Sequence, residues 1–415
     1  MALQEDRIGN GIAVIGAGTT GYLTTLFLCK NYPDVKIKWI YPENNTPIGV
    51  GEATVPEVTK FLKELGITPK IIINKINGSL KVGVKFKDFY KPNHDICHPF
   101  GATEEESYNL KYCMENDIVP DDILDYDEIA MHFDVRELML YLDGIMKDLP
   151  NLIIERRIVN DISEVKEDTI IDCTGFKRAL VNYEFIDITD KIPNNKALVY
   201  RTKYKNIKDK VPYTTAVAAD HGWIWETPLN KTIAYGYVHD GQYNVKEEFV
   251  DHLKKYYDYV DESLIREVPM ITGRNTKHII RENGKTIVTL GLSSFFIEPL
   301  ESTGLYLVVY GIRTLDKYLK GQVSADYYNY DYNHEFDVIL DFIIAHYKYS
   351  TYNNDYWNHY KNLEIQTYRE NNIFPKRSWD YLLSGFDQVE FKPKMDPKTF
   401  LTVRKGTKYN EKDFT

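Results

Sequence analysis

The chain has 415 residues, of which 43% are hydrophobic, so it exceeds one ordinary domain and can bury a sizeable core. Its net charge of −10 argues against nucleic-acid binding as the main function. No apolar run is long enough to span a bilayer, and the first ten residues lack the basic and apolar regions of a signal peptide.

The four cysteines, Cys29, Cys97, Cys113 and Cys173, form no CxxC pair and match no zinc-binding pattern. We expect them to be reduced and mostly buried, as is typical of cytosolic proteins. Together with the composition, they predict a soluble, cytoplasmic protein with no metal site, no nucleic-acid partner and no membrane partner.

The first predicted unit is a strand at 12–15, a helix at about 19–30 and a second strand at 36–41. A second strand of this kind normally ends in an acid that binds the ribose of a dinucleotide. Here Tyr41 occupies that position, and Glu43 in the next turn is an alternative.

The turn between the first strand and the helix reads Gly16-Ala17-Gly18-Thr19-Thr20-Gly21, a G-x-G-x-x-G in the context that binds a dinucleotide. Gly16 permits the tight turn, Gly18 lets a pyrophosphate approach the backbone, and Gly21 lets the helix pack close on the sheet. The helix N-terminus then stabilises the phosphate charge.

The next segment, "PIGVGEATVPEVTKFLKELGI" at 47–67, predicts a glycine-containing loop before an amphipathic helix. Gly49 and Gly51 suit a close approach to the backbone, and Thr54 and Pro56 mark the helix start. A flat cofactor ring would fit over this loop, although a well-capped loop without a ligand is equally compatible with these residues.

The stretch "SLKVGVKFKDF" at 79–89 alternates, with Lys81, Gly83, Lys85 and Lys87 on one face of a strand and apolar residues on the other. Taken alone, this pattern favours a half-buried strand with a solvated cationic face.

An amphipathic helix is predicted at 134–149, and short strands between about 197 and 239 predict an antiparallel sheet. Within that sheet, "GWIWETP" places Trp223 and Trp225 on one face of a strand. Without further context, two such aromatics are more often core or edge residues.

The stretch "SSFFIEPLESTGLYLVVYG" at 293–311 places Glu298 and Glu301 inside apolar sequence. Ser302 or Thr303 can cap a helix that starts at this point, and its N-terminus can hold an anion. For Glu298 the residues favour a carboxylate hydrogen-bonded to backbone in a tight turn. The chain beyond about 304 is predicted to be mostly helical.

Several of these stretches together resemble the flavin-dependent halogenases of the tryptophan halogenase family. The resemblance is carried by "GAGTTGY", "GVGEATVPEV" and "FFIEPLESTGLY", and by "NGSLKVGVKFKDF", "HFDVREL", "DCTGF", "GWIWETPL", "GRNTKHI" and "FIIAHYKYS" in the family's order. It extends from about residue 10 to 386. Thr227 departs from the family's W-x-W-x-I-P signature, and the chain after about residue 370 is short.

The resemblance implies an α/β fold with an FAD-binding Rossmann-like domain of the glutathione-reductase type. This halogenase core would span residues 1–320, with an interleaved antiparallel sheet at approximately 195–285 as the wall between flavin and substrate. A mainly helical, substrate-side region would follow at 321–415.

The resemblance also implies the chemistry. Reduced FAD, supplied by diffusion from a separate flavin reductase, would react with O₂ and a halide such as chloride or bromide to give hypohalous acid. This would pass to Lys81, the catalytic lysine, for electrophilic halogenation of an indole- or phenol-like substrate. Glu301 would be the second catalytic residue, stabilising the cationic ring intermediate or accepting its proton, and Lys85 would be structural.

The remaining site residues follow from matched positions. The flavin would contact Gly16, Gly18, Thr19, Thr20, Gly21, Gly51, Glu52, Ala53, Leu292, Ser302 and Leu305. The halide would bind backbone at Thr303 and Gly304, and Ser302 would link the flavin side to the lysine side. Trp223 and Trp225 would form the barrier between flavin and substrate, and His98 and Phe100 would lie near the substrate.

Two other functions are compatible with the motifs. A single-component flavin monooxygenase or oxidoreductase would share the G-x-G-x-x-G and "DCTG", and a non-catalytic flavin-binding protein would share the fold. The substrate, free or carrier-bound, the halide, the regioselectivity and a possible homo-oligomer are not readable from these residues.

Overall fold

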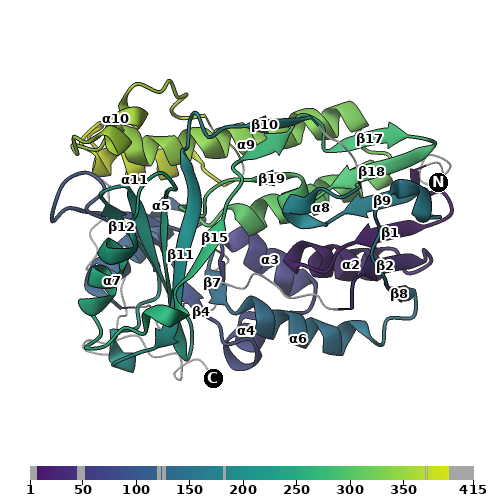
Figure 1. Ribbon diagram of the computed structural model, residues 1–415, viewed down its shortest axis with the longest axis horizontal. Helices are drawn as coiled ribbons and strands as arrows, with labels where there is room; N and C mark the ends of the chain where they lie inside the picture. The colour runs from purple at the N-terminus through teal and green to yellow at the C-terminus, as the bar shows by residue number, and fades with distance from the viewer. Residues whose placement is uncertain are drawn as a thin grey trace.

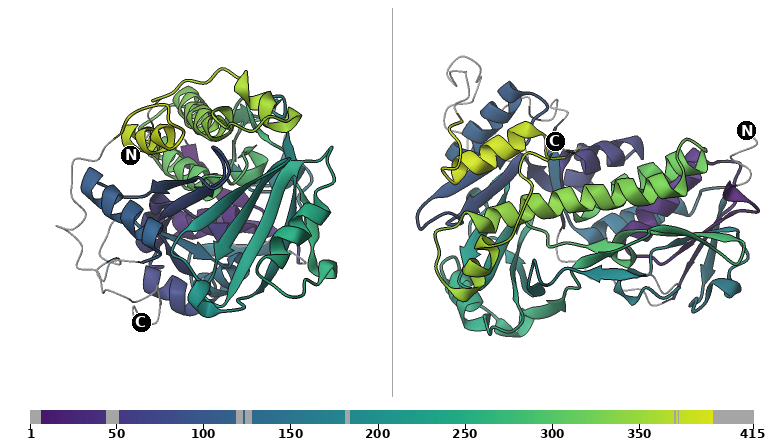
Figure 2. Two further views of the ribbon diagram at one scale, coloured as in Figure 1. Left: turned by 90° about the vertical axis from the view of Figure 1, so that its left-hand side faces the viewer. Right: turned by 90° about the horizontal axis from the view of Figure 1, so that it is seen from above.

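The computed structural model describes residues 7–43, 52–118, 123, 128–180, 184–369, 371 and 373–391. Two large sheets lie at opposite ends of an elongated molecule, and helix α9 (Ala325–Lys348) runs along both of them (Figures 1 and 2). None of the helices in these ranges combines the length and apolarity needed to cross a bilayer.

The first sheet has six strands in the order β17-β18-β9-β1-β2-β8, and only β17 runs antiparallel to its neighbour. The central β1 pairs with β2 and β9, so that Ile12 stands between Ile37 and Thr169. The strands are β1 (Ile12–Ile15), β2 (Ile37–Tyr41), β8 (Leu152–Arg156), β9 (Thr169–Asp172), β17 (Ile279–Glu282) and β18 (Lys285–Thr289).

The predicted dinucleotide-binding unit is confirmed as a strand, turn, helix and strand. Helix α2 (Thr19–Asn31) follows β1 and contacts β1, β2, α6 (Val135–Met146) and α8 (Gly304–Leu319). Because it is surrounded in this way, its residues 21–29 are all buried. The predicted amphipathic helix at 134–149 corresponds to α6.

The second sheet has seven strands in the order β15-β11-β14-β13-β12-β5-β6 and is antiparallel except between β12 and β5. It therefore combines the strands predicted between about 197 and 239 with β15, which was not predicted, and with two strands from the first hundred residues. The strands are β5 (Gly83–Lys87), β6 (Asp95–Pro99), β11 (Asn194–Lys203), β12 (Thr214–Ala219), β13 (Gly222–Pro228), β14 (Thr232–Asp240) and β15 (Arg266–Pro269).

The extent of this sheet differs from the predicted range of 195–285. Strands β17 and β18 belong to the six-stranded sheet, whereas β5 and β6, which precede that range, join the antiparallel one. Two three-stranded sheets connect the large ones. They contain β3 (Glu52–Ala53), β4 (Ser79–Lys81) and β7 (Ala130–Phe133), and β10 (Phe185–Asp187), β16 (Gly273–Asn275) and β19 (Phe295–Phe296).

The helices cover both sheets, and the predicted helical character beyond residue 304 is confirmed within the described part of the chain. A continuous apolar core joins the six-stranded sheet to these helices, from Val14 through Leu80 and Trp223 to Trp379. The other helices are α3 (Pro56–Glu64), α4 (Pro69–Lys75), α5 (Glu104–Asn116), α7 (Lys246–Lys254), α10 (Asp355–Lys361) and α11 (Lys376–Gly385).

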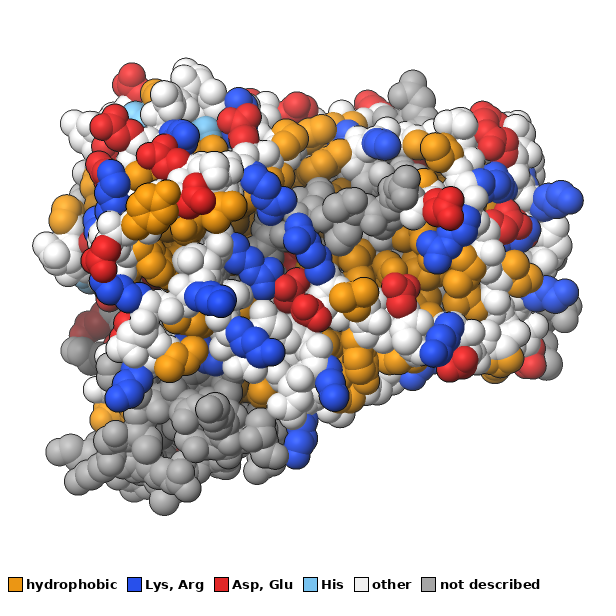
Figure 3. Space-filling view, turned by 60° about the horizontal axis from the view of Figure 1, so that its bottom comes forward, with side chains coloured by type: hydrophobic (Ala, Val, Ile, Leu, Met, Phe, Trp, Pro, Cys, Tyr) orange, Lys and Arg blue, Asp and Glu red, His pale blue; other side chains and the backbone are white. Residues whose placement is uncertain are grey.

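The surface carries both charge signs, as the composition suggests. On the face shown in Figure 3, acidic and basic side chains lie among hydrophobic ones. All four cysteines are buried, in agreement with the expectation that they are mostly buried.

A substitution at Gly21 can test whether α2 packs closely on the glycine turn. A Cβ atom at Gly21 would lie 2.1 Å from the carbonyl oxygen of Gly16, whereas a Cβ atom at Gly144, exposed in α6, would meet nothing within 4 Å. We expect Gly21→Ala to lower the free energy of unfolding in urea by roughly 1–3 kcal/mol. Gly144→Ala is the matched control and should raise it by about 1 kcal/mol through helix propensity. Equal effects of the two substitutions would contradict a close contact at Gly21.

Candidate active site

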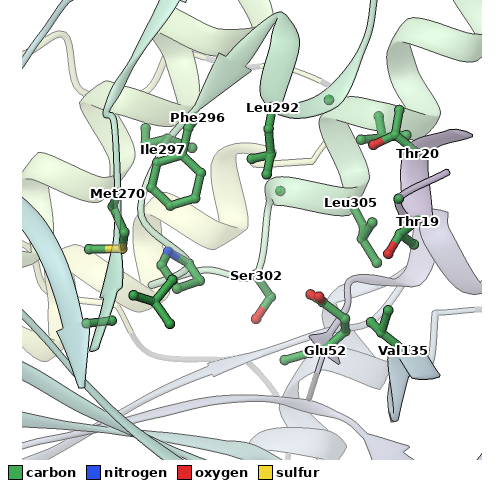
Figure 4. Close-up of a pocket in the computed structure, with 18 of the residues that line it drawn as sticks. Thr19, Thr20, Glu52, Val135, Met270, Leu292, Phe296, Ile297, Ser302 and Leu305 are labelled. Atoms are coloured by element: carbon green, nitrogen blue, oxygen red, sulfur yellow. The ribbon is translucent and has the colours of Figure 1, made fainter. Parts of the chain in front are cut away.

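A cavity of about 300 Å³, the larger cavity, lies where the two large sheets meet the N-termini of α2 and α8. This volume is at the lower end of the range for small-molecule and cofactor sites. Figure 4 shows side chains from α2, β3, α8 and the loop before α8 around this space. Its lining includes Gly18, Thr19, Thr20, Glu52, Ala53, Trp223, Trp225, Leu292, Ser302, Gly304 and Leu305.

The glycine turn fits a ligand at the N-terminus of α2. Gly16 has φ +109°, and a Cβ atom there would lie 2.3 Å from the carbonyl oxygen of Cys173, so only glycine is accommodated. At Gly18 a Cβ atom would meet no protein atom within 4 Å, which is consistent with open space for a phosphate. Of the predicted flavin contacts, Gly51 lies outside the described residues, as does Gly49.

Glu52 is the one acid of the predicted flavin-contact set. It lies on β3, which pairs with β7, and its side chain lines the larger cavity (Figure 4). Burial raises the pKa of the Glu52 carboxyl to about 7. A carboxyl of this kind can be neutral or charged near neutral pH, and therefore can donate or accept a hydrogen bond at the cavity wall.

Tyr41 occupies the position of the expected ribose-binding acid, but its side chain packs inside the protein. Its ring is 3% exposed, packs on Trp39 with ring centroids 4.3 Å apart, and lies 4.2 Å from the Arg156 guanidinium carbon. The side chain is thus committed to packing at the end of β2, and Glu43 is exposed in the following turn.

The start of α8 differs from the predicted capping. Thr303 is the N-cap residue, but no side chain caps the helix within the described chain, and the buried Thr303 Oγ1 has no hydrogen-bond partner there. Ser302 has φ +61° and directs its hydroxyl elsewhere. At Gly304 a Cβ atom would meet nothing within 4 Å, so the helix N-terminus opens toward the larger cavity.

Lys81 is fully buried at the end of β4. Its Nζ donates hydrogen bonds to the Ser302 hydroxyl oxygen at 2.7 Å and to the Thr54 carbonyl oxygen at 2.8 Å. It also lies 5.2 Å from the ring centre of Phe100. Burial lowers the pKa of Lys81 to about 7, although the Glu301 charge opposes this shift.

A second cavity, the smaller cavity, has a volume of about 120 Å³ and lies beside Phe100, one of the contacts of Lys81. Its wall includes His98, Phe100 and Glu301, and Glu57, Glu128 and Arg377 also line it. Because Ser302 lines the larger cavity and Phe100 lines the smaller one, the Lys81 ammonium group lies between the two.

Glu301 is fully buried and held by two histidines. His98 Nδ1 lies 3.0 Å and 3.1 Å from its two carboxylate oxygens, and His346 Nε2 lies 2.9 Å from Oε1. Burial alone would raise the pKa of Glu301, but His98 and His346 outweigh it and hold the pKa at about 2. The sequence does not single out His346, because it lies inside an apolar helical pattern.

The sequence favoured a Glu298 carboxylate that is hydrogen-bonded to backbone in a tight turn, and this interpretation is wrong. The buried carboxylate accepts hydrogen bonds from the side chains of Asn194, at 2.6 Å, and Tyr347. Burial raises the pKa of Glu298 to about 7, although these hydrogen bonds oppose the shift. Glu298 thus ties the loop before α8 to β11 and α9.

The lysine-containing stretch also differs from the half-buried strand that alternation favours. Hydrogen bonding changes from β4 to β5 at Val82, whose N–H donates to the Pro212 carbonyl and whose carbonyl accepts from Phe100 N–H. Residues 79–86 are all buried, so no solvated cationic face exists there. Lys85 lies 3.8 Å from Asp117 and 4.6 Å from the Tyr213 ring centre, which supports a structural role.

Trp223 and Trp225 stand on one face of β13 and line the larger cavity, with ring centroids 6.0 Å apart. Gly236 on the neighbouring β14 leaves room for this face, since a Cβ atom there would lie 1.9 Å from the Trp225 ring. Thr227 lines the same cavity at the position where it departs from the family signature.

The buried amine of Lys81 should be visible in stability measurements. Its pKa is about 7 in the folded protein and 10.5 without the shift, so between these pH values the unfolded chain binds more protons. The free energy of unfolding should therefore gain a contribution that increases as pH rises from about 7 to 10.5. In Lys81→Met, urea unfolding at several pH values should show a smaller increase. An unchanged slope would contradict a buried amine with a lowered pKa.

Comparison with known proteins agrees with this architecture. A sequence model of the tryptophan halogenase family matches residues 11–124 and 151–393. The chain is 25% identical to the tryptophan 6-halogenase ThaL of Streptomyces albogriseolus, covering 87% of this chain and 80% of that protein. It is also 25% identical to the tryptophan 7-halogenase RebH of Lentzea aerocolonigenes, covering 82% of this chain and 76% of that protein.

Solved structures show the same fold. The tryptophan 6-halogenase SttH of Streptomyces toxytricini superposes with a TM-score of 0.78 at 23% identity, covering 94% of each chain. A flavin-dependent halogenase from Xanthomonas campestris gives a TM-score of 0.80 at 20% identity, covering 92% of this chain and 90% of that one. The α/β fold with its C-terminal helices is thereby confirmed. The chain belongs to the tryptophan halogenase family and is a flavin-dependent halogenase.

Proposed function

We propose that this flavin-dependent halogenase generates its halogenating agent in the larger cavity and passes it, through Lys81, to an aromatic ring in the smaller cavity. The observation that carries this proposal is the position of Lys81. Its Nζ bonds to Ser302, which lines the larger cavity, and lies against Phe100, which lines the smaller one.

The residues around the larger cavity fit FAD. The N-terminus of α2 at Gly18 offers a positive helix end to phosphates, and the apolar wall around Leu292 and Leu305 suits a flat ring. When reduced FAD is bound there, it supplies, with O₂ and a halide ion, hypohalous acid. We expect a separate flavin reductase to provide the reduced FAD. Thr303 and Gly304 would hold the halide at the open N-terminus of α8.

Lys81 would capture the hypohalous acid in one of two ways. As an ammonium ion it donates a hydrogen bond that polarises the oxygen–halogen bond. As a neutral amine it forms a nitrogen–halogen bond while the halogen–oxygen bond breaks, and the amine proton leaves with hydroxide as water. A pKa of about 7 makes both forms available near neutral pH.

The barrier and the substrate wall would have separate tasks. Trp223 and Trp225 would keep the aromatic substrate away from the flavin, which suppresses direct oxygenation. His98 and Phe100 would contact the ring in the smaller cavity. A cavity of about 150 Å³ can hold benzene, so the volume of about 120 Å³ is close to the space for one aromatic ring.

Glu301 would complete the substitution. When the halogen adds to the ring, a positive charge develops that the nearby carboxylate stabilises. The ring proton then passes to a Glu301 oxygen, and the electron pair of the carbon–hydrogen bond restores the aromatic system. A pKa of about 2 keeps Glu301 ionised, and a weak base is sufficient because a protonated ring is a very strong acid.

The substrate is expected to be indole- or phenol-like. Several relatives are tryptophan halogenases by name, which supports an indole. The test is to incubate the protein with a flavin reductase, NADH, FAD and bromide, and to offer indoles, phenols and anilines. Mass spectrometry should show the paired bromine isotopes in the product. Products that gain only oxygen would support a monooxygenase, and FAD binding without product would support a non-catalytic protein.

Lys81→Ala should abolish halogenation while FAD binding is kept, because Lys81 transfers the halogen and lies outside the proposed flavin contacts. Bromide incorporation and FAD titration measure the two effects separately. Lys85→Ala is the matched control from the adjoining strand and should retain activity. If Lys81→Ala loses FAD binding as well, its proposed role is wrong.

Glu301→Gln should slow halogenation most for weakly activated rings, since these depend most on stabilisation of the ring cation. We expect a loss on the order of 10²-fold or more for such rings, in the range found when one charge-stabilising group is removed. Initial rates with a series of substituted phenols and indoles would measure the trend. An equal loss for every ring would argue against this role.

A further inference from the structure

His346 is the second histidine in contact with Glu301. It is on α9, is 0% exposed and stacks obliquely on Phe86 at 4.5 Å between ring centroids. Its Nδ1 lies 2.8 Å from the Phe342 carbonyl oxygen, and its Nε2 lies 2.9 Å from Glu301 Oε1. Both ring nitrogens therefore face an oxygen.

The two contacts require two protons. A backbone carbonyl only accepts, so His346 Nδ1 must carry a proton to bond to Phe342. The carboxylate oxygen of Glu301 also accepts when ionised, so a second proton must lie between Nε2 and Oε1. Either His346 is an imidazolium ion beside a carboxylate, or a neutral imidazole faces a protonated Glu301.

The surroundings of Glu301 favour the ion pair. His98 Nδ1 contacts both carboxylate oxygens, at 3.0 Å and 3.1 Å, and can donate one proton to them as a neutral ring. A carboxylate held by two donors is stabilised as the anion. The shared proton then belongs to His346.

We propose that His346 is a positioning residue that stays protonated against Glu301, so that the pair is electrically neutral and Lys81 faces a compensated carboxylate. The functional consequence rests on the proposed role of Lys81 as the halogen carrier. An uncompensated Glu301 would raise the pKa of Lys81 further, because a nearby negative charge favours the charged amine. With His346 protonated, Lys81 can lose its proton near neutral pH.

Other charged and titratable groups around this pair have partners of their own. His98 on β6 contacts Glu301, and Lys81 on β4 bonds to the neighbouring Ser302. His132 on β7 is engaged by Ser79 and Thr214. Glu298, from the same loop, is bound by Asn194 and Tyr347. The further charged residues that line the smaller cavity are Glu57, Glu128 and Arg377.

The protonation of His346 can be measured without activity. In the intact protein labelled with ¹⁵N-histidine, long-range proton–nitrogen spectra distinguish an imidazolium ring, with two protonated nitrogens, from a neutral ring. The spectrum of His346→Gln assigns the signal. We expect two protonated nitrogens for His346 at pH 7. One unprotonated nitrogen in that ring would overturn the inference, whatever the enzyme does with substrates.

The charge compensation can be measured by activity. In His346→Gln the side chain can still donate to Glu301 but carries no charge, so the pH midpoint assigned to Lys81 should rise by roughly 1 unit. The double variant His346→Gln/Glu301→Gln should return it toward the wild-type value. Bromination of a strongly activated phenol over pH provides the midpoint. An unchanged midpoint in His346→Gln, or one that stays raised in the double variant, would overturn the proposal.

Failure of the charge compensation is distinguishable from failure of the proposed function. If the wild-type protein halogenates no acceptor, the proposed function fails, and the nitrogen spectra still decide the state of His346. If halogenation is observed but the pH midpoint assigned to Lys81 is the same in the wild-type protein and in His346→Gln, only the charge compensation fails. Should His346→Gln not fold, His346→Asn is the second variant, and the ring signal that it removes from the wild-type spectrum assigns His346.

Discussion

The candidate active site depends on one buried amine, that of Lys81. Lys81 is fully buried, and taking a charged amine out of water costs several kcal/mol unless the protein supplies partners. Two of its partners, Ser302 and Thr54, come from different loops, the first 221 residues away in the chain. Holding this one group therefore brings together β4, the segment before α3 and the loop before α8, and these elements separate the two cavities.

The loop before α8 explains why two acids occur in apolar sequence. Glu298 and Glu301 are three residues apart and both fully buried, yet their environments give them opposite protonation behaviour. Burial raises the pKa of Glu298 to about 7 against the opposing effect of its neutral donors, whereas the two histidines around Glu301 outweigh burial and hold its pKa at about 2. Between the two acids and α8, Ser302 adopts a positive φ of 61° that aims its hydroxyl at Lys81. Glu298 thus fixes the loop to the rest of the fold, whereas Glu301 and Ser302 present their side chains to the candidate site.

The local parts of this arrangement could be predicted from the sequence. The strand, glycine turn and helix of residues 12–31 are set by short-range rules of turn geometry and periodicity, and they lie where these rules place them. The partners of the acids could not be predicted. Asn194 reaches Glu298 across 104 residues, and His346 reaches Glu301 across 45, so only the tertiary fold defines these contacts. The change from one sheet to another at Val82 could not be predicted either. An alternating pattern of residues is the same whether its strand belongs to one sheet or to two.

In the proposed function the two cavities are separate, and the halogen passes from one to the other at Lys81. The charge of Lys81 therefore affects this transfer. In the proposed function, hypohalous acid passes the lysine, whereas the aromatic ring and the flavin stay apart. If Glu301 acted on Lys81 as a bare anion, the electrostatics that stabilise a ring cation would also favour the ammonium form of Lys81 and disfavour the haloamine. In our proposal a proton on His346 reduces this conflict, because Glu301 keeps its negative oxygens for the ring while the His346–Glu301 pair is neutral overall. The second histidine is then what allows one carboxylate and one lysine to work in the same buried space.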